Sequence, residues 1–154
     1  MAVEIEKKFL VQSDDWKKGV KGILYRQGYL STHKERTVRI RTEGNQAVLT
    51  IKGLTVEASR PEFEYPIPFE HAIQMLDQLC EKPLIEKSRY KIPHKDHIWE
   101  VDEFLGLNRG LIVAEIELQS EDETFEKPGW IGKEVTADPR YFNSNLVTSP
   151  FSTW

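Results

Sequence analysis

Cysteine is almost absent from this chain, and its one cysteine, Cys80, has no partner for an intramolecular disulfide. A lone cysteine also excludes a metal site built on several thiolates. A basic excess is missing too, because 21 lysines and arginines are set against 25 acidic residues and the net charge is −4. This balance argues against general nucleic-acid binding, which usually needs a positively charged surface. It still allows a small polyanion to be held by a local group of basic residues.

Long apolar runs are missing as well. No stretch approaches the roughly 20 apolar residues of a membrane-spanning helix. Charged residues begin at Glu4, which is not the pattern of a signal peptide. We therefore expect a cytoplasmic protein with no membrane partner. No linker or long internal repeat divides the 154 residues, so one domain over residues 1–154 is predicted.

Most of the chain shows the period-two alternation of β-strands, in which polar and apolar residues occupy opposite faces. Strands are predicted at residues 3–11, 23–30, 37–42, 47–52, 60–67, 85–92, 97–104 and 112–119. Residues 70–80 have a helical period instead, with Ile73, Leu76, Leu79 and Cys80 on one stripe. Residues 132–136 are predicted to be extended and residues 140–147 to form a short helix. The acidic run at 121–126 is interpreted as a solvated segment.

Charges of one sign are grouped on the polar faces of these strands. The acidic groups are Glu4 with Glu6, Glu62 with Glu64, Glu100 with Asp102, and Glu115 with Glu117. The basic groups include Arg39 with Arg41, Lys52, and Lys87 with Arg89. For any single strand, the ordinary interpretation is an amphipathic strand whose charged face meets water. The grouping by sign, and the preference of arginine for planar anions, favour a barrel with a charged lumen. The predicted helix and the C-terminal tail would then cover part of its apolar outside.

The ordered motifs resemble the CYTH superfamily, the triphosphate tunnel metalloenzymes. Residues 4–8 (EIEKK) resemble the ExExK signature of that family, which alone would be a weak signal. Further segments that resemble family motifs are 27–30 (QGYL), 38–41, 50–53, 87–89, 100–102, 114–117, 132–136 and 140–143. The set extends over roughly residues 3–145, and this ordered coverage makes the resemblance specific.

The resemblance implies an α+β fold dominated by β-structure: an eight-stranded antiparallel β-barrel that forms a tunnel with a charged lumen and a few flanking helices. It also implies metal-dependent chemistry on triphosphate groups, with Mg²⁺ or Mn²⁺ as the cofactor and a small polyanion as the substrate.

Residue roles follow from the chemistry of triphosphate, whose closely spaced charges need cationic donors from several directions. The predicted substrate-binding residues are Lys8, Arg39, Arg41, Lys52, Lys87, Arg89 and Lys133. Carboxylates are the hard ligands that Mg²⁺ and Mn²⁺ prefer. The predicted metal ligands, which with Lys8 are also the predicted catalytic residues, are Glu4, Glu6, Glu115 and Glu117. Further candidates are Glu62, Glu64, Asp102, Tyr29 and Tyr141. For Lys8, contact with a phosphate and neutralisation of Glu6 both stay open.

Hydrolysis of inorganic triphosphate to pyrophosphate and phosphate is the leading functional prediction, because the short chain leaves little sequence for a nucleoside pocket. The enzymatic alternatives are a nucleoside or thiamine triphosphatase and a class IV-type adenylyl cyclase. A non-catalytic barrel that binds polyphosphate or nucleotide is disfavoured, because paired acids beside an anion do not help binding alone. A lipocalin-type barrel needs an apolar lumen, so it fails if the basic side chains point inward. A homodimer stays an open option.

Overall fold

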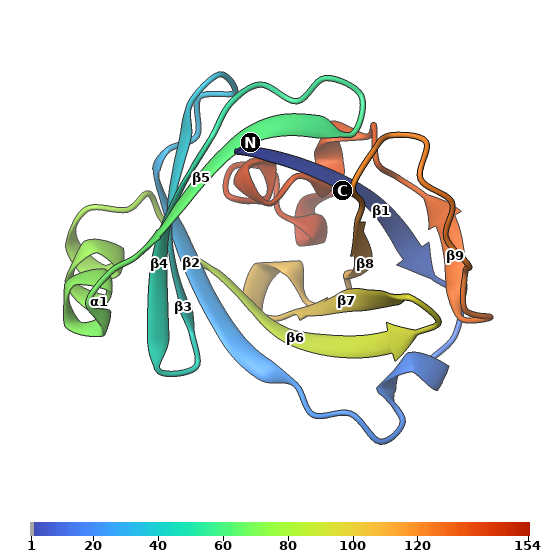
Figure 1. The fold of residues 1–154 in the computed structure, drawn as a ribbon. Coiled ribbons are helices and arrows are strands. Elements are labelled where there is room, and N and C mark those ends of the chain that lie inside the picture. The colour runs from blue at the N-terminus through green and yellow to red at the C-terminus, as the bar shows by residue number, and fades with distance from the viewer. Residues whose placement is uncertain (1) are drawn as a thin grey trace.

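The computed structural model describes residues 2–154, and its strands curve into a barrel (Figure 1). The strands are β1 (Val3–Val11), β2 (Ile23–Ser31), β3 (Thr37–Glu43), β4 (Gln46–Lys52), β5 (Ser59–Pro66), β6 (Ile85–His94), β7 (His97–Phe104), β8 (Ile112–Glu117) and β9 (Ile131–Glu134). Their order is β5-β4-β3-β2-β6-β7-β8-β1-β9, and β5 also pairs with β1, so eight strands form a closed ring. The predicted eight-stranded antiparallel barrel is confirmed, and β9 lies outside the ring on the edge of β1.

Helix α1 (Phe69–Gln78) covers the outside of β3 and β4. Its residues Ala72 and Leu76 pack with Ile40 of β3 and Ala47 of β4. The predicted apolar stripe is correct for Leu76 but wrong for Leu79, whose side chain is 66% exposed. The reason is that α1 ends at Gln78, one residue earlier. Within residues 2–154, no helix is long and apolar enough to cross a membrane.

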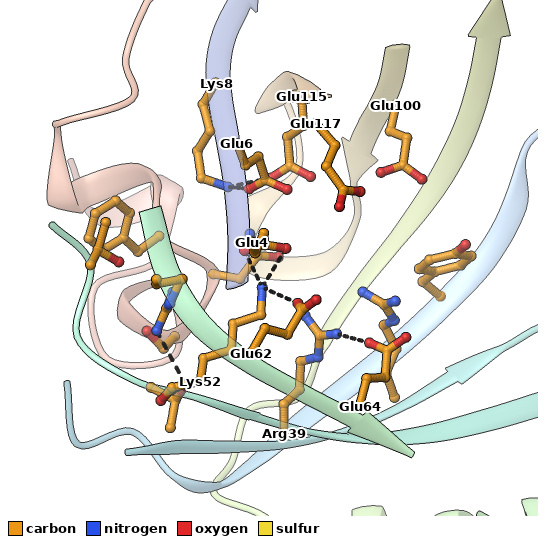
Figure 2. Close-up of a pocket in the computed structure, with 18 of the residues that line it drawn as sticks. Glu4, Glu6, Lys8, Arg39, Lys52, Glu62, Glu64, Glu100, Glu115 and Glu117 are labelled. Atoms are coloured by element: carbon orange, nitrogen blue, oxygen red, sulfur yellow. Dashed lines mark hydrogen bonds and ion pairs between the residues drawn. The ribbon is translucent and has the colours of Figure 1, made fainter. Parts of the chain in front are cut away.

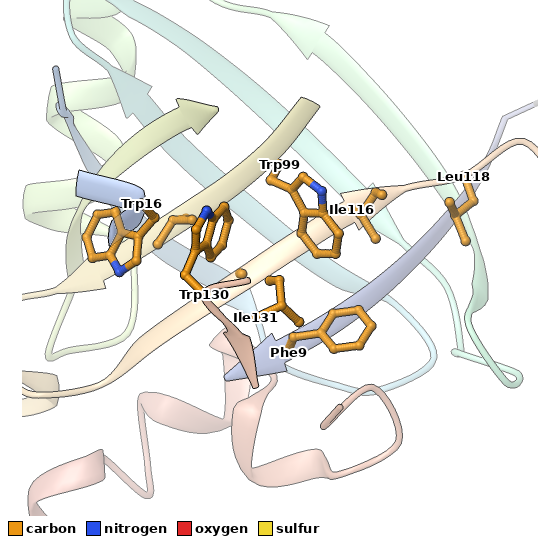
Figure 3. Packing of buried hydrophobic residues seen from close by; sticks show 9 residues of the cluster. Phe9, Trp16, Trp99, Ile116, Leu118, Trp130 and Ile131 are labelled. Atoms are coloured by element: carbon orange, nitrogen blue, oxygen red, sulfur yellow. The ribbon is translucent and has the colours of Figure 1, made fainter. Parts of the chain in front are cut away.

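The largest group of aromatic residues lies on the outside of β1, β7 and β8 (Figure 3). Phe9 and Trp99 belong to the strand faces opposite to the charged residues, and their rings meet edge to face at 5.5 Å between centroids. Trp16 and Trp130, from the segments before β2 and before β9, pack over them. The apolar outside of the barrel is therefore covered by connecting segments as well as by α1.

One end of the lumen is apolar, and the C-terminal segment fills it. Ile85 and Phe104 belong to the inward faces of β6 and β7, and they pack with Tyr141, Leu146 and Val147. Figure 1 shows the C-terminal turns, drawn in red, within the outline of the barrel. The tail therefore has two roles: its first part, with Trp130 and Ile131, covers the outside as predicted, and its last part closes the lumen. The predicted helix over 140–147 is two short 3-10 turns, Pro139–Tyr141 and Asn143–Leu146, because the backbone of Phe142 between them is extended.

We predict that Leu76→Ala lowers the free energy of unfolding by about 2–5 kcal/mol, because the fully buried side chain would leave a cavity between α1 and the barrel. The matched control is Leu79→Ala, which alters an exposed side chain just after the same helix and should change stability by less than about 0.5 kcal/mol. Urea unfolding followed by tryptophan fluorescence measures both variants. Equal losses would contradict the packing of α1 against β3 and β4.

Candidate functional site

A cavity of about 290 Å³ lies inside the barrel, and charged side chains from β1 and from β3 to β8 line it. Figure 2 shows these side chains pointing from the surrounding strands toward a common centre. The predicted residues that line it are Glu4, Glu6, Lys8, Tyr29, Arg39, Arg41, Lys52, Glu62, Glu64, Lys87, Arg89, Glu115 and Glu117. The lumen is charged as predicted, which excludes the apolar lumen of a lipocalin-type barrel.

Three predicted site residues do not line this cavity. Lys133 is exposed on β9, which lies outside the closed ring, so its predicted position in the tunnel is wrong. Tyr141 packs in the apolar end of the lumen and against Trp154, with 5.2 Å between ring centroids. Asp102 is only 1% exposed and lies behind the basic residues of β6.

Asp102 holds two of the predicted substrate-binding cations in place. Arg89 donates to both of its carboxylate oxygens, at 2.7 and 2.8 Å, and the Nζ of Lys87 lies 2.7 Å from Oδ2. Burial acts to raise the pKa of Asp102, but Arg89 and Lys87 lower it below its ordinary value. Burial lowers the pKa of Lys87 to about 8, although Asp102 opposes that shift. Asp102 therefore orients cations and does not itself face the cavity.

Arg39 is a buried cation whose donors are incompletely used. Its Nη2 donates to Thr50 Oγ1 at 3.2 Å and lies 3.6 Å from Glu64, while its buried Nε has no hydrogen-bond partner among residues 2–154. Burial, together with the nearby Arg41, lowers the pKa of Arg39. Buried polar groups are normally paired. Arg39 therefore places on the wall of the cavity a guanidinium whose hydrogen-bonding capacity the protein does not use fully, as a site for an anion requires.

Lys8 lies between two carboxylates of neighbouring strands. Its Nζ is 3.1 Å from Glu6 Oε1 and also contacts Glu115 Oε2. Glu115 accepts a further bond from Arg89 at 3.2 Å. Burial would raise the pKa of Glu115, but Lys8 and Arg89 hold it well below its ordinary range. Burial would lower the pKa of Lys8, but Glu115 and Glu6 raise it. Lys8 and Glu115 are therefore both charged at neutral pH.

The remaining acids of β1 and β8 are crowded. Burial, with the charges of Glu115 and Glu4, raises the pKa of Glu6 to about 7. Burial and the charges of Glu4 and Glu6 also raise the pKa of Glu117, which faces Glu6 across the β1–β8 pair. Glu4 itself is paired with Lys52 at 3.0 Å. The local excess of negative charge favours a bound cation.

The donor chemistry fits a hard divalent metal ion, because several carboxylate oxygens from two adjacent strands face one cavity. No three histidine, cysteine, aspartate or glutamate side chains of residues 2–154 converge as a preformed metal site. The carboxylates are instead engaged by lysine and arginine, so binding of a metal would require some of these ion pairs to rearrange.

Three further residues belong to the site. The Oδ1 of Asn143, in a C-terminal turn, accepts bonds from Lys87 at 2.9 Å and from Gln27 at 3.1 Å. The ring of Tyr25 lies 4.9 Å from the guanidinium groups of both Arg41 and Arg89. Arg60 lines the cavity from β5. Arg60 had a sequence signal, because it alternates with two acids on the inward face of its strand, and Asn143 lies in the segment 140–143 that resembles a family motif, although no role was predicted for it.

The chain is similar to named proteins over nearly its whole length. An inorganic triphosphatase of Acetivibrio thermocellus is 53% identical over 154 residues, which are 100% of this chain and 99% of that protein. An inorganic triphosphatase of Nitrosomonas europaea is 37% identical over 155 residues, covering 95% of this chain and 97% of that protein. The crystal structure of the inorganic triphosphatase NE1496 matches with a TM-score of 0.65 and 34% identity, covering 93% of this chain and 96% of that one.

The predicted resemblance is confirmed by a family comparison. The family model described as the CYTH domain matches residues 2–147. These residues include every strand of the barrel and every side chain that lines the charged cavity. The chain belongs to the CYTH family.

Proposed function

We propose that this protein is an enzyme that hydrolyses inorganic triphosphate to pyrophosphate and phosphate. The proposal rests on one cavity that holds two kinds of charged group. Cations point into it, among them Arg39 with its incompletely used donors, and the crowded carboxylates around Glu6 line it as well. A site for binding alone would gain nothing from those acids. Relatives that are 53% and 37% identical over nearly the full chain are named inorganic triphosphatases.

The basic residues are assigned to the substrate. Arg39, Arg41 and Lys52 reach the cavity from β3 and β4, and Lys87 and Arg89 reach it from β6. Donors from different strands can contact different phosphoryl groups of one triphosphate, and arginine can bind phosphate oxygens in a bidentate manner. Their positive charge also stabilises the negative charge that shifts onto the bridging oxygen during reaction.

We also propose that the enzyme depends on a divalent metal ion, Mg²⁺ or Mn²⁺, held by Glu4, Glu6, Glu115 and Glu117. When bound, such an ion neutralises phosphate charge and activates the attacking water. In the hydrolysis itself, a water oxygen forms a bond to a terminal phosphorus, the bond from this phosphorus to the bridging oxygen breaks, pyrophosphate leaves with the electron pair, and the proton that the water loses is released to the solution. Lys8, with Arg89, keeps the carboxylate of Glu115 ionised, and its positive charge opposes the rise in the pKa of Glu6.

We propose that residues 1–154 act as one catalytic domain in the cytoplasm, on a small polyanion and without nucleic acid or membrane as a partner. The strands that line the cavity are drawn from both the first and the last third of the described chain.

Metal removal and loss of one carboxylate should both stop the reaction. We predict that phosphate release from inorganic triphosphate requires Mg²⁺ or Mn²⁺ and falls at least about 100-fold in Glu4→Gln and Glu117→Gln. Release is measured side by side with inorganic triphosphate, ATP and thiamine triphosphate, with metal and with EDTA. Glu126→Gln, which alters an exposed glutamate, is the matched control. Full activity in EDTA would contradict the metal dependence.

The substrate role of Arg39 has its own test. We predict that Arg39→Ala lowers kcat/KM for inorganic triphosphate, because it removes a buried cation from the wall of the cavity. The fall should correspond to a loss of about 2–4 kcal/mol in transition-state stabilisation. Arg36→Ala removes an exposed arginine just before the same strand and should leave kcat/KM unchanged. Wild-type kinetics in the Arg39 variant would show that this side chain does not bind the substrate.

The crowded acids should limit stability. The pKa of Glu6 is about 7 in the folded protein against an ordinary value of 4.5, so the folded state binds more protons between these values and its stability falls as the pH rises through them. We predict that Glu6→Gln raises the free energy of unfolding of the metal-free protein at pH 8 by about 1–3 kcal/mol. Urea unfolding at pH 8 and at pH 4 measures the difference, which should vanish at pH 4. A gain that is equal at both values would exclude this cause.

A further inference from the structure

On one of its two edges, strand β1 changes partner in the middle of the site. Residues 3–5 pair with β5, while residues 9–11 pair with β9. In the described chain, residues 6–8 have no strand partner on that edge, although their other edge pairs with β8. We call this interruption, at residues 6–8, the β1 seam. It lies directly beside the site residues Glu6 and Lys8.

A second cavity opens at the β1 seam and borders the first. Its lining residues are Lys7, Glu57, Ala58, Glu121, Glu134, Thr136 and Ala137. Glu57, Ala58 and Thr136 also line the main cavity, so they form a thin wall between the two. The backbone of β1 at the seam is therefore held by isolated contacts and not by a continuous ladder.

One of these contacts fixes Glu6. The N–H of Glu6 donates to the carbonyl of Ala58 at 3.0 Å. Ala58 follows Glu57, whose φ of 58° lies in the left-handed region that side chains other than glycine rarely adopt. The local backbone preference therefore does not hold this turn in place, and an outside contact is needed.

Glu121 supplies that outside contact. Its Oε1 accepts bonds from the N–H of Ala58 at 3.1 Å and from the hydroxyl of Ser59 at 3.1 Å. The interpretation of residues 121–126 as a solvated segment is wrong for Glu121, because its carboxylate is used by the turn that precedes β5. Hydrogen bonds to an ionised acceptor are stronger than neutral ones. Ala58 is thus held at both of its backbone polar groups: its N–H donates to Glu121, and its carbonyl accepts from the N–H of Glu6.

We propose that Glu121 is a positioning residue for Glu6. Its carboxylate holds the turn at Ala58 and Ser59 against β1, and so determines where the Glu6 carboxylate lies in the cavity. The predicted effect on catalysis rests on the proposed function. The substrate-binding cations of β3, β4 and β6 lie on other strands, so loss of the contact should alter the chemical step more than substrate binding.

The kinetic test compares Glu121→Ala with two matched variants. We expect Glu121→Ala to lower kcat for inorganic triphosphate by about 10- to 100-fold while KM changes by less than about threefold, because the site acid is displaced and the cations are not. Glu121→Gln should restore kcat to within about threefold of wild type, since the amide oxygen still accepts both bonds. Glu126→Ala, an exposed acid of the same segment, should behave as wild type.

Amide hydrogen exchange of the metal-free protein tests the contact without any activity. In Glu121→Ala, exchange at the amides of Glu6 and Ala58 should become about tenfold faster, while the amide of Phe9 is unchanged. Glu121→Gln should keep the wild-type rates. If Glu121→Ala does not fold, Ser59→Ala replaces it: this variant removes one of the two donors and should give a smaller change in the same direction.

The outcomes separate the positioning role of Glu121 from the proposed triphosphatase function. Unchanged exchange at Glu6, or wild-type kcat in a folded Glu121→Ala, would overturn the role of Glu121. A failure of Glu121→Gln to restore kcat would also overturn it, because charge and not hydrogen bonding would then matter. If the wild-type protein does not hydrolyse inorganic triphosphate, the proposed function fails, and exchange at Glu6 still decides whether Glu121 positions it.

Discussion

Arg89 and Asp102 form a two-bond ion pair that is almost completely shielded from water, with the carboxylate 1% exposed. An uncompensated charge at such a depth would cost several kcal/mol. The interior of this barrel is therefore possible only because cations and carboxylates lie next to each other on neighbouring strands. The period-two alternation of the strands supplies this arrangement, since each strand that turns an apolar face outward must turn its charged face toward the others.

The proposed function follows from the buried groups whose charge or hydrogen-bonding capacity is not fully paired within the protein. Lys87 and Arg89 are both paired with Asp102, but among residues 2–154 the buried Nε of Arg39 has no partner, and the pKa of Glu6 is raised to about 7. A barrel selected for stability alone would have paired these groups or replaced them with apolar side chains. A polyanion and a divalent cation together would satisfy both deficits at once, which is why a triphosphate with a metal ion suits this lumen better than either alone.

Much of the barrel could be predicted because strand pattern and ring closure reinforce each other. Charged residues at alternate positions of seven of the eight barrel strands must face the same interior once the strands close into a ring, so their convergence followed from the sequence. The contributions of Asn143 and Glu121 could not be predicted, because each acts through a contact with a segment far away in the chain. The prediction that Lys133 binds the substrate placed it in the barrel, but it lies on β9, outside the ring. The local sequence of β9 resembles that of a barrel strand, and only the pairing of the strands shows that β9 is not one of them. The exposed position of Leu79 depended on where α1 ends, which periodicity alone does not determine.

Strand β1 has two roles, one in the architecture of the barrel and one in the functional site. It closes the ring by pairing with β5 and β8, and it also presents Glu4, Glu6 and Lys8 to the cavity. At the middle of the strand, one edge of β1 has no continuous strand partner among the described residues. Single backbone bonds to Ala58 and Val135 hold it there, together with the side-chain oxygens of Thr136 and, through Ala58, of Glu121. Side-chain contacts can be adjusted by single substitutions, whereas a backbone ladder cannot. Residues that contribute nothing to the cavity's charge can therefore tune the position of the site acids, so the geometry of the site depends on the last third of the chain as well as on the opening strand.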